Sequence, residues 1–560
     1  MGLPLFWLFV LAACLLWSAT FTAAAARSRS FGTLLALAAW LVPVLVLLPA
    51  VVLTGVLAFG TPLSTNHFAA TLSLALAALV GGVWITVAGR RHAEADGAPV
   101  AARWPVIGLA GLCGMAVLVA WGTLLAVDNA IAAEAAQARA EAAALMQANL
   151  PPAVADADNA APLHRHAAAL LAADDRWSAF NPEDPLDIRS PTVAELLARH
   201  RETLDLIRRA ADRDVCRFDR DWSRPSISML LPEIQALRGE TRLLALAARR
   251  SAADGDAAAA LADTVRIHRI ARQAATEPIL VCYLVSIATD TLARDTLSRV
   301  LPTLADDDVA LLDDPGVDDL VGPPPPLLRA MLGEETIGLS VFADLATARM
   351  SMANLDRLVG GNHSLQIWDG LGFHIWDGLG PLSRTLFLPT DLAAYRELLH
   401  QYQEVCSQEQ PHAAAWQAVA TTEQTVVKRG ILTGLLVPAL SAVHGAWMRA
   451  DAAARAARVL VAATRRRLAG GGLPDSIEAL VPDELSAVPR DPCSDNQPLR
   501  FKPVEDGLLV WWVGPDGADD GGPTARNTRS EDFAAGNDDE GLWLVPDGAA
   551  EKRREPVATE

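Results

Sequence analysis

The fold of the middle of the chain follows from residues 234–275, which read IQALRGETRLLALAARRSAADGDAAAALADTVRIHRIARQAA. Apolar residues recur in this stretch at i, i+3 and i+4 spacing, the period of an α-helix with one buried face. The DGD triplet at 254–256 interrupts the period with a turn signal. The stretch therefore predicts two helices joined as a hairpin, and ILVCYLVSIATDTLARDTLSRVL predicts a third helix after Pro278. We expect an α-helical hairpin domain over residues 191–321.

The segments on either side of this domain differ in composition. Residues 129–190 begin with NAIAAEAAQARAEAAALMQANL, whose good helix formers predict a helical stalk followed by a linker. Four consecutive prolines open residues 322–428, a predicted Pro- and Gly-rich region of linker and helices. IWDGLG occurs twice there, at 367–372 and 375–380, and we interpret the repeat as a loop held by its tryptophans. A surface that binds a partner or a sugar is the alternative.

Four long uncharged apolar runs open the chain, at residues 3–26, 31–60, 69–89 and 105–127. A helix of about 20 residues crosses a bilayer core about 30 Å thick, and backbone groups in lipid must bond within the segment. The runs therefore predict four N-terminal transmembrane helices within residues 1–128.

The loops between these runs predict an orientation through the positive-inside rule. The loop between the second and third runs holds no arginine. The loops after the first and third runs together hold five, which are Arg27, Arg29, Arg90, Arg91 and Arg103. We expect a multi-pass protein of a bacterial inner (cytoplasmic) membrane with residues 129–560 extracytoplasmic. Two alternatives stay open: the first run is a cleaved signal peptide, or residues 430–447 form a fifth span and return the C-terminus to the cytoplasm.

Charge excludes some partners. The formal net charge is −19, and the first 128 residues hold five arginines against three acidic residues, so the acidic excess lies after residue 128. Nucleic-acid binding needs a basic face, and docking on anionic lipid heads needs basic clusters. The predicted partners are the membrane, as an integral protein, and other proteins of the envelope, with no nucleic acid.

Recognisable catalytic motifs are absent from the sequence. It contains no phosphate-binding P-loop, no GxSxG nucleophile elbow and no HExxH metal motif. His164 and His166 form an HxH pair without a ligand-like partner, and we interpret them as part of a surface loop. His268, near arginines on a predicted helix, is interpreted as structural. The sequence nominates no catalytic and no cofactor-binding residue.

Four cysteines follow the predicted membrane region: Cys216, Cys282, Cys406 and Cys493. In an oxidising compartment they can form disulfides. Four cysteines allow three pairings, among which the sequence does not choose.

The C-terminal part, residues 429–548, predicts an ordered series of elements. An alanine-rich amphipathic helix over 437–468 is ended by three glycines. A short helix follows, in which Asp475 and Glu478 resemble a capping box.

A hairpin comes next in this part. Residues 499–502 and 508–513 predict short strands, and the dipeptide DG at 506–507 is a hairpin turn signal. An acidic, glycine-rich loop follows, and residues 549–560 are expected to be a disordered tail.

This part contains four short sequence segments, in the order LPDSIEALVP, AVPRDP, PLRF and VGPDGADDGG. Together they resemble the soluble domain of the major pseudopilin of type II secretion systems, over residues 438–547. The whole chain is more similar to uncharacterised bacterial envelope proteins that end in such a module. The resemblance implies a small α+β fold. One departure is the DPC at Cys493, where the family has DPW or DPF. The family also places a single membrane helix at the N-terminus of its pilin helix, after a processed leader; here only FGTLL at Phe31 is similar to that leader, and it has no glutamate at the fifth position.

The resemblance also implies a calcium site in the loop after the hairpin. Its ligands would be a turn aspartate, a backbone carbonyl and later acidic side chains: Asp516, Val513, Asp519 or Asp520, and Asp538 or Asp539. Calcium takes six to eight hard oxygen ligands at flexible distances, which clustered aspartates supply. An acidic loop that binds no ion is the alternative.

The predicted fold class is therefore membrane α-helical, with four N-terminal transmembrane helices, followed by a mainly α soluble region and a small α+β pseudopilin-like C-terminal module. The predicted function is a non-enzymatic, membrane-anchored envelope protein with an extracytoplasmic binding or assembly role, secretion- or pilus-related, and a calcium-stabilised C-terminal loop. The alternatives are an extracytoplasmic hydrolase with an unidentified carboxylate pair and a transport component.

Overall fold

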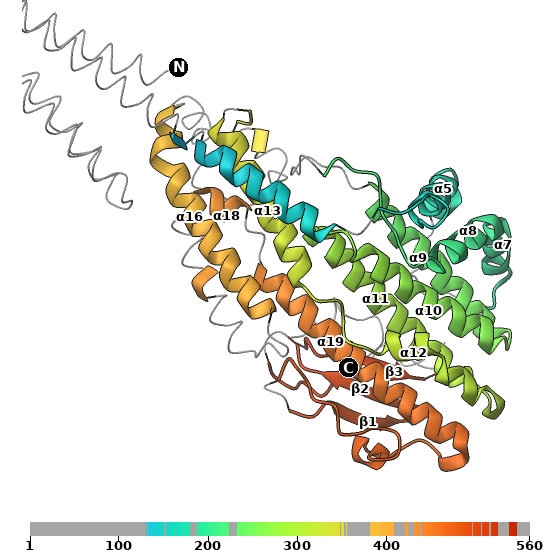
Figure 1. Ribbon diagram of the computed structural model, residues 1–560. Coiled ribbons are helices and arrows are strands. Elements are labelled where there is room, and N and C mark those ends of the chain that lie inside the picture. The colour runs from blue at the N-terminus through green and yellow to red at the C-terminus, as the bar shows by residue number, and fades with distance from the viewer. Residues whose placement is uncertain are drawn as a thin grey trace, which may run out of the picture. The chain divides into compact units, whose positions relative to one another are not determined.

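Figure 1 shows the computed structural model of the chain. The structure describes residues 130–131, 133–150, 153–179, 187–222, 232–347, 349–351, 354–355, 381–407, 421–423, 431–436, 440–494, 497–505, 507–514, 517–524 and 537–545. These residues are mostly helical, and a small three-stranded sheet lies near the C-terminal end of the chain.

The fold class predicted from the sequence, a membrane α-helical protein with four N-terminal spans, is wrong. Among the described residues no helix combines the length and the apolar character needed to cross a membrane. The four apolar runs behind the prediction lie outside those residues. Residues 430–447, the alternative fifth span, fall partly in the short helix α18 (Ile431–Leu436) and partly in α19 (Leu440–Arg466), whose later turns carry charges. The corrected fold class is a mainly helical chain with a small antiparallel sheet.

The predicted helical hairpin is confirmed. The two helices of the hairpin and the third helix are α9 (Pro232–Ala253), α10 (Ala257–Ala274) and α11 (Leu280–Val300). Gly255 makes the turn with a φ of 86°, and the side chain of Asp256 caps α10 by accepting the N–H of Ala259 at 3.0 Å. The three helices pack against one another and bury a continuous apolar core (Figure 1).

Smaller helices surround this group. They are α5 (Ala161–Ala172), α6 (Asp175–Ala179), α7 (Pro191–Arg199), α8 (Arg201–Ala211), the 3-10 helices η2 (Leu301–Thr303) and η3 (Asp306–Asp313), and α12 (Pro315–Leu320). α5 packs on α8 and α9, and α8 packs on α10. Two longer helices are α13 (Leu328–Ala346) and α16 (Pro381–Cys406).

The sheet consists of β1 (Arg500–Val504), β2 (Gly507–Trp512) and β3 (Glu540–Leu544), antiparallel in that order. The side chains of β2 alternate between its two faces. Leu508, Val510 and Trp512 join the main core, which includes residues of α19, while Leu509 and Trp511 form a separate cluster on the other face. The predicted strands and turn are confirmed to within two residues, whereas β3 was not predicted.

The predicted capping box is wrong. The short helix is the 3-10 helix η5 (Ile477–Leu480), which begins after Ser476 without a side-chain cap. The long helix α19 is confirmed; it passes through the π-helical turn η4 (Arg467–Gly471) and ends where Gly470 and Gly472 have φ values of 82° and 68°.

The helical hairpin and the C-terminal sheet share one hydrophobic core. α19 packs against α11 on one side and against β2 and β3 on the other. Arginines at the end of α19 and in η4 cap the free carbonyls of neighbouring helices. Arg467 donates to the carbonyls of Leu301 and Leu304 at 3.2 and 3.1 Å, and Arg465 donates to that of Leu312 at 2.6 Å. The helical part therefore supports the sheet that carries the candidate site.

The contacts divide the chain into two units, and the elements above, from α5 through α12 and from α19 to β3, belong to one of them. The other unit includes residues 338–397 and 425–437. There the buried carboxylate of Asp391 in α16 accepts the N–H groups of Leu432 and Thr433 at 3.2 and 3.4 Å, which caps the start of α18.

Candidate metal centre

The candidate metal centre lies where two loops meet beside the sheet. One loop follows β2 and the other precedes β3. The first loop rests on the outer face of the sheet, because a Cβ on Gly522 would lie 3.1 Å from the ring of Trp511 and 3.2 Å from Leu509. Gly521 and Gly522 have φ values of 91° and 87°, so glycine lets the chain turn closely over this face.

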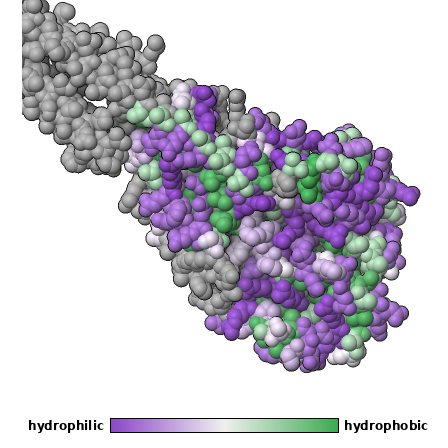
Figure 2. Space-filling model, viewed as in Figure 1, coloured by the Kyte–Doolittle hydropathy of each residue, from purple (hydrophilic) through white to green (hydrophobic). Residues whose placement is uncertain are grey.

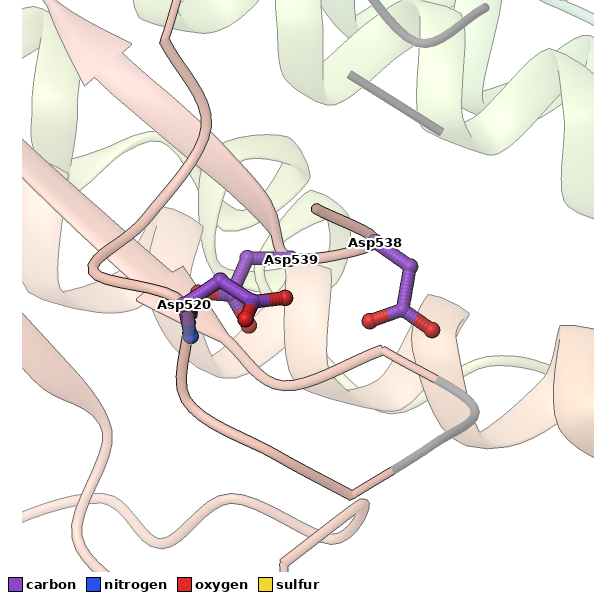
Figure 3. Close-up of side chains that lie close together, drawn as sticks. All are labelled: Asp520, Asp538 and Asp539. Atoms are coloured by element: carbon purple, nitrogen blue, oxygen red, sulfur yellow. Dashed lines mark hydrogen bonds between the residues drawn. The ribbon is translucent and has the colours of Figure 1, made fainter. Parts of the chain in front are cut away.

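Three aspartates meet at this point: Asp520, Asp538 and Asp539 (Figure 3). One carboxylate oxygen from each lies within 4.8 Å of the others. Two oxygens on opposite sides of a calcium ion lie about 5 Å apart, because each Ca–O distance is about 2.3–2.6 Å. The three oxygens therefore fit around one ion. Among the described residues no other group of three or more His, Cys, Asp or Glu side chains meets this condition.

Asp539 is the most constrained member of the three. It is 5% exposed, and its Oδ2 accepts the N–H groups of Asp520 and Gly522, each at 2.9 Å. Its Oδ1 is buried and has no hydrogen-bond partner among the described residues. Burial raises the pKa of Asp539 against the lowering effect of the two N–H groups, and the carboxylates of Asp519 and Asp520 raise it further. A buried carboxylate oxygen without a partner is unfavourable, and a cation is the partner that it lacks.

Gly514 keeps the end of β2 close to Asp538. A Cβ at Gly514 would overlap the carboxylate and the carbonyl of Asp538. Only a residue without a side chain therefore lets the peptide between Val513 and Gly514 lie beside this aspartate. The N–H of Gly517 donates to the carbonyl of Gly514 at 3.1 Å, which closes the turn.

Asp519 faces away from the cluster. Its Oδ1 accepts Nε1 of Trp511 at 3.0 Å and the N–H of Gly521 at 3.1 Å, while its Oδ2 lies 3.2 Å from Nε of Arg500. Burial acts to raise the pKa of Asp519, but these three donors outweigh it and hold the pKa below its ordinary value. Asp519 thus fixes the position of the loop in which Asp520 lies.

Arg500, in the PLRF segment, connects this loop to the VPRDP segment of the sequence. Its NH1 forms an ion pair with Asp491, which is fully buried, and its NH2 donates to Oγ of Ser494 at 3.1 Å. Asp491 also accepts the N–H groups of Cys493 and Val513 at 2.8 and 3.1 Å. One buried carboxylate therefore ties the turn before β1 to the end of β2.

The structure brings together some of the predicted ligands. Asp520, Asp538 and Asp539 converge. Val513 is buried just after β2, and its N–H donates to the carboxylate of Asp491. The next residue, Gly514, lies against Asp538. Asp516 lies outside the described residues.

A buried polar network between four helices was missed by the sequence analysis. The prediction that His164 lies in a surface loop is wrong, because His164 is 1% exposed in α5. Its Nδ1 lies 2.6 Å from Oε2 of Glu240 in α9, and its Nε2 lies 3.0 Å from Oε1 of Gln273 in α10. The Nε2 of Gln273 donates to the carbonyls of Ala210 and Arg213. Its Oε1 is therefore an acceptor, and Nε2 of His164 carries a hydrogen.

The sequence held one signal for this network. The helical period of residues 161–172 places His164 one turn after the start of a helix and not in a loop. The partners Glu240 and Gln273 are 76 and 109 residues away in sequence, so no local pattern could pair them. The prediction for His268 is confirmed: it is buried, and its Nδ1 lies 2.6 Å from Oδ1 of Asp290. The four cysteines after residue 128 are free thiols.

Several carboxyl groups with raised pKa values lie in buried pairs. Burial raises the pKa of Glu240 beside His164 and that of Glu277 beside Arg220, and the pKa of Asp491 is raised by burial against its donors. None of these groups lines the cavity described below.

Comparison with protein-family models, with curated proteins and with solved structures found no match.

Proposed function

We propose that this protein is a helical binding or assembly protein whose C-terminal loops are joined by one calcium ion. Asp520, Asp538 and Asp539 would hold the ion, and backbone carbonyls and water would complete its oxygen shell. The ion would supply charge neutralisation and a crosslink between the loop after β2 and the residues that begin β3.

The unpartnered Oδ1 of Asp539 carries this proposal. Acidic clusters on a surface are common without an ion, and solvent satisfies their oxygens. Asp539 differs because it is buried and its Oδ2 is fixed by two N–H groups, while no described residue donates to its Oδ1. A hard cation bound between this oxygen and the two neighbouring carboxylates would satisfy it.

Oxygen-only ligands on loops favour calcium over other metals. Zinc prefers Cys and His ligands, and neither occurs in the cluster. Magnesium demands near-octahedral geometry, whereas calcium tolerates irregular loops. A site with few fixed ligands belongs to the weak class, with dissociation constants of about 10⁻⁴–10⁻³ M. Such a site is filled where calcium is abundant, which agrees with the expectation that residues 129–560 are extracytoplasmic.

The proposed role is non-enzymatic. The ion would join two segments of an acidic surface in a chain of net charge −19, and the resulting surface would bind other envelope proteins. The resemblance of the C-terminal words to a pseudopilin supports partners in a secretion or pilus-like assembly. The carboxyl groups with raised pKa values in buried pairs give no specific support to the hydrolase alternative.

Calcium titration of the purified full-length chain tests the proposal. Isothermal titration calorimetry should show one site. In 10 mM calcium the free energy of unfolding should rise by about 1.4–2.7 kcal/mol for the affinities given above. The variant Asp539→Asn should lose both effects. No calcium binding by the wild-type chain would overturn the proposal.

The binding role has a separate test. Partners captured from envelope extracts by the wild-type chain should be released by a chelator and should not be captured by Asp539→Asn. The variant Asp483→Asn removes an exposed acid elsewhere in the C-terminal part and should capture them as the wild type does. Capture that is equal with and without calcium would contradict the proposed role of the ion.

A further inference from the structure

A second candidate site lies on the helical hairpin part, at a cavity of about 810 Å³. Its volume falls in the range of small-molecule sites, about 300–1,000 Å³. Eight charged residues line it: Arg199, Arg201, Glu202, Asp205, Arg208, Arg209, Asp212 and Arg266. The lining thus holds five arginines and three acids in a chain of net charge −19. Figure 2 shows hydrophilic side chains over the part of the surface where α7 and α8 lie.

A buried carboxylate fixes two of the arginines. Asp263 in α10 is 1% exposed. Its oxygens accept Nε and NH2 of Arg208 at 3.0 and 2.7 Å and NH1 of Arg266 at 3.0 Å. Arg266 is also held in a two-point contact by Asp212, at 3.1 and 3.0 Å. These guanidinium groups are therefore rigid parts of the wall, with less conformational entropy left to lose when a ligand binds.

Two other arginines keep most of their donors available. Arg201 is exposed and makes no hydrogen bond or ion pair with any described residue. Arg209 is exposed, and its one hydrogen bond within the described residues runs from Nε to the carbonyl of Asp205 at 3.3 Å. A guanidinium carries five N–H donors, which match the oxygens of a phosphate. NH1 of Arg199 lies 3.6 Å from Oδ2 of Asp174, which is a looser contact.

The positions along α8 set the shape of the ligand. Arg199 ends α7 and Arg201 begins α8, and Arg208 and Arg209 lie two turns further along α8. A rise of 1.5 Å per residue separates Arg201 from Arg208 by about 10 Å. Glu202 and Asp205 lie between the two ends and would accept hydrogen bonds from hydroxyl groups while repelling an anion at the centre.

We propose that this cavity binds a molecule with two phosphate groups about 10 Å apart, joined by a bridge that carries hydroxyl groups. Arg199 and Arg201 bind one phosphate, and Arg208, Arg209 and Arg266 bind the other. The bridge donates hydrogen bonds to Glu202 and Asp205. Such a ligand is either a free sugar bisphosphate or a lipid headgroup with two phosphates.

Titration of the full-length chain with fructose 1,6-bisphosphate tests the soluble source. Fructose 6-phosphate and inorganic phosphate are the single-phosphate probes, and they should bind at least tenfold more weakly. The variants Arg201→Glu and Arg209→Glu should each weaken binding of the bisphosphate by tenfold or more. Arg238→Glu makes the same charge change at an exposed position of α9 outside the cavity and should leave binding unchanged.

Sedimentation with phosphatidylcholine vesicles, with and without cardiolipin, tests the lipid source. Binding that needs cardiolipin and is lost in Arg201→Glu and Arg209→Glu supports a headgroup, and binding of the sugar bisphosphate alone supports a free ligand. Far-ultraviolet circular dichroism should show native helix in each variant. If neither probe binds the wild-type chain, or if the two cavity variants bind as Arg238→Glu does, the proposal is wrong.

Discussion

The Nε of Arg500 lies 3.2 Å from Oδ2 of Asp519, and this contact joins β1 to the loop of the candidate metal centre. Arg500 touches none of the three converging aspartates in the contacts described, so it would act on the ion only through the position of the loop. Asp519, predicted as a ligand, would act in the same indirect way.

Replacing Arg500 by Gln should therefore weaken calcium binding without removing a ligand. We expect a three- to tenfold increase in the calcium dissociation constant, because Asp519 loses one of the three donors that fix it. Calorimetry with calcium gives this ratio. The variant Lys502→Gln removes an exposed cation of the same strand and should leave the constant within twofold. Equal constants for the wild type and Arg500→Gln would show that the contact does not position the site.

Substituting Gly514 by Ala should disturb the site from the other side. A Cβ there overlaps Asp538, so either this aspartate or the end of β2 must move. We expect at least tenfold weaker calcium binding. Gly255→Ala is the control: Gly255 has a positive φ of 86° and open space around it, so Ala there costs about 1 kcal/mol of stability without touching the site. Unchanged calcium affinity in Gly514→Ala would contradict the placement of Asp538.

The buried pair of His164 and Glu240 predicts a pH dependence of stability. Burial alone would lower the pKa of His164, but the carboxylate of Glu240 and the hydrogen bonds from Glu240 and Gln273 outweigh burial and raise it. The histidine of the unfolded chain has the ordinary value near 6.5. The stabilisation is therefore fully present below about pH 6.5 and is lost as the pH rises through the folded-state pKa.

Chemical denaturation between pH 6 and pH 9 measures this effect. The free energy of unfolding should fall by at most about 1.4 kcal/mol per pH unit from the titration of this histidine. Glu240→Gln should reduce the slope, because a neutral amide no longer raises the pKa of His164. The same slope in the variant and in the wild type would contradict the assignment.

The sequence predicted those parts of the fold that depend on local pattern. The turn at Gly255 and the periodic apolar residues on either side gave α9 and α10, and the DG dipeptide at 506–507 gave the β1–β2 hairpin. β3 was not predicted because its five residues after a long loop carry little local signal. It is fixed by pairing with β2, as in the register of Leu509 with Trp543.

The candidate site was predictable in composition but not in geometry. The acidic loop indicated that aspartates gather there, yet Asp519 and Asp520 are adjacent in sequence and face different partners. The choice between them depends on Arg500 and Trp511, which reach Asp519 across the sheet. The predicted fold class rested on four apolar runs outside the described residues, and no described helix has the length and apolar character to cross a membrane.

Calorimetric titration of calcium into the wild-type chain and into Asp539→Asn is the decisive experiment for the proposed ion. The wild type should show one site with a dissociation constant of about 10⁻⁴–10⁻³ M, and the variant should show no measurable heat of binding. Calcium binding of equal affinity in both proteins, or none in either, would contradict it.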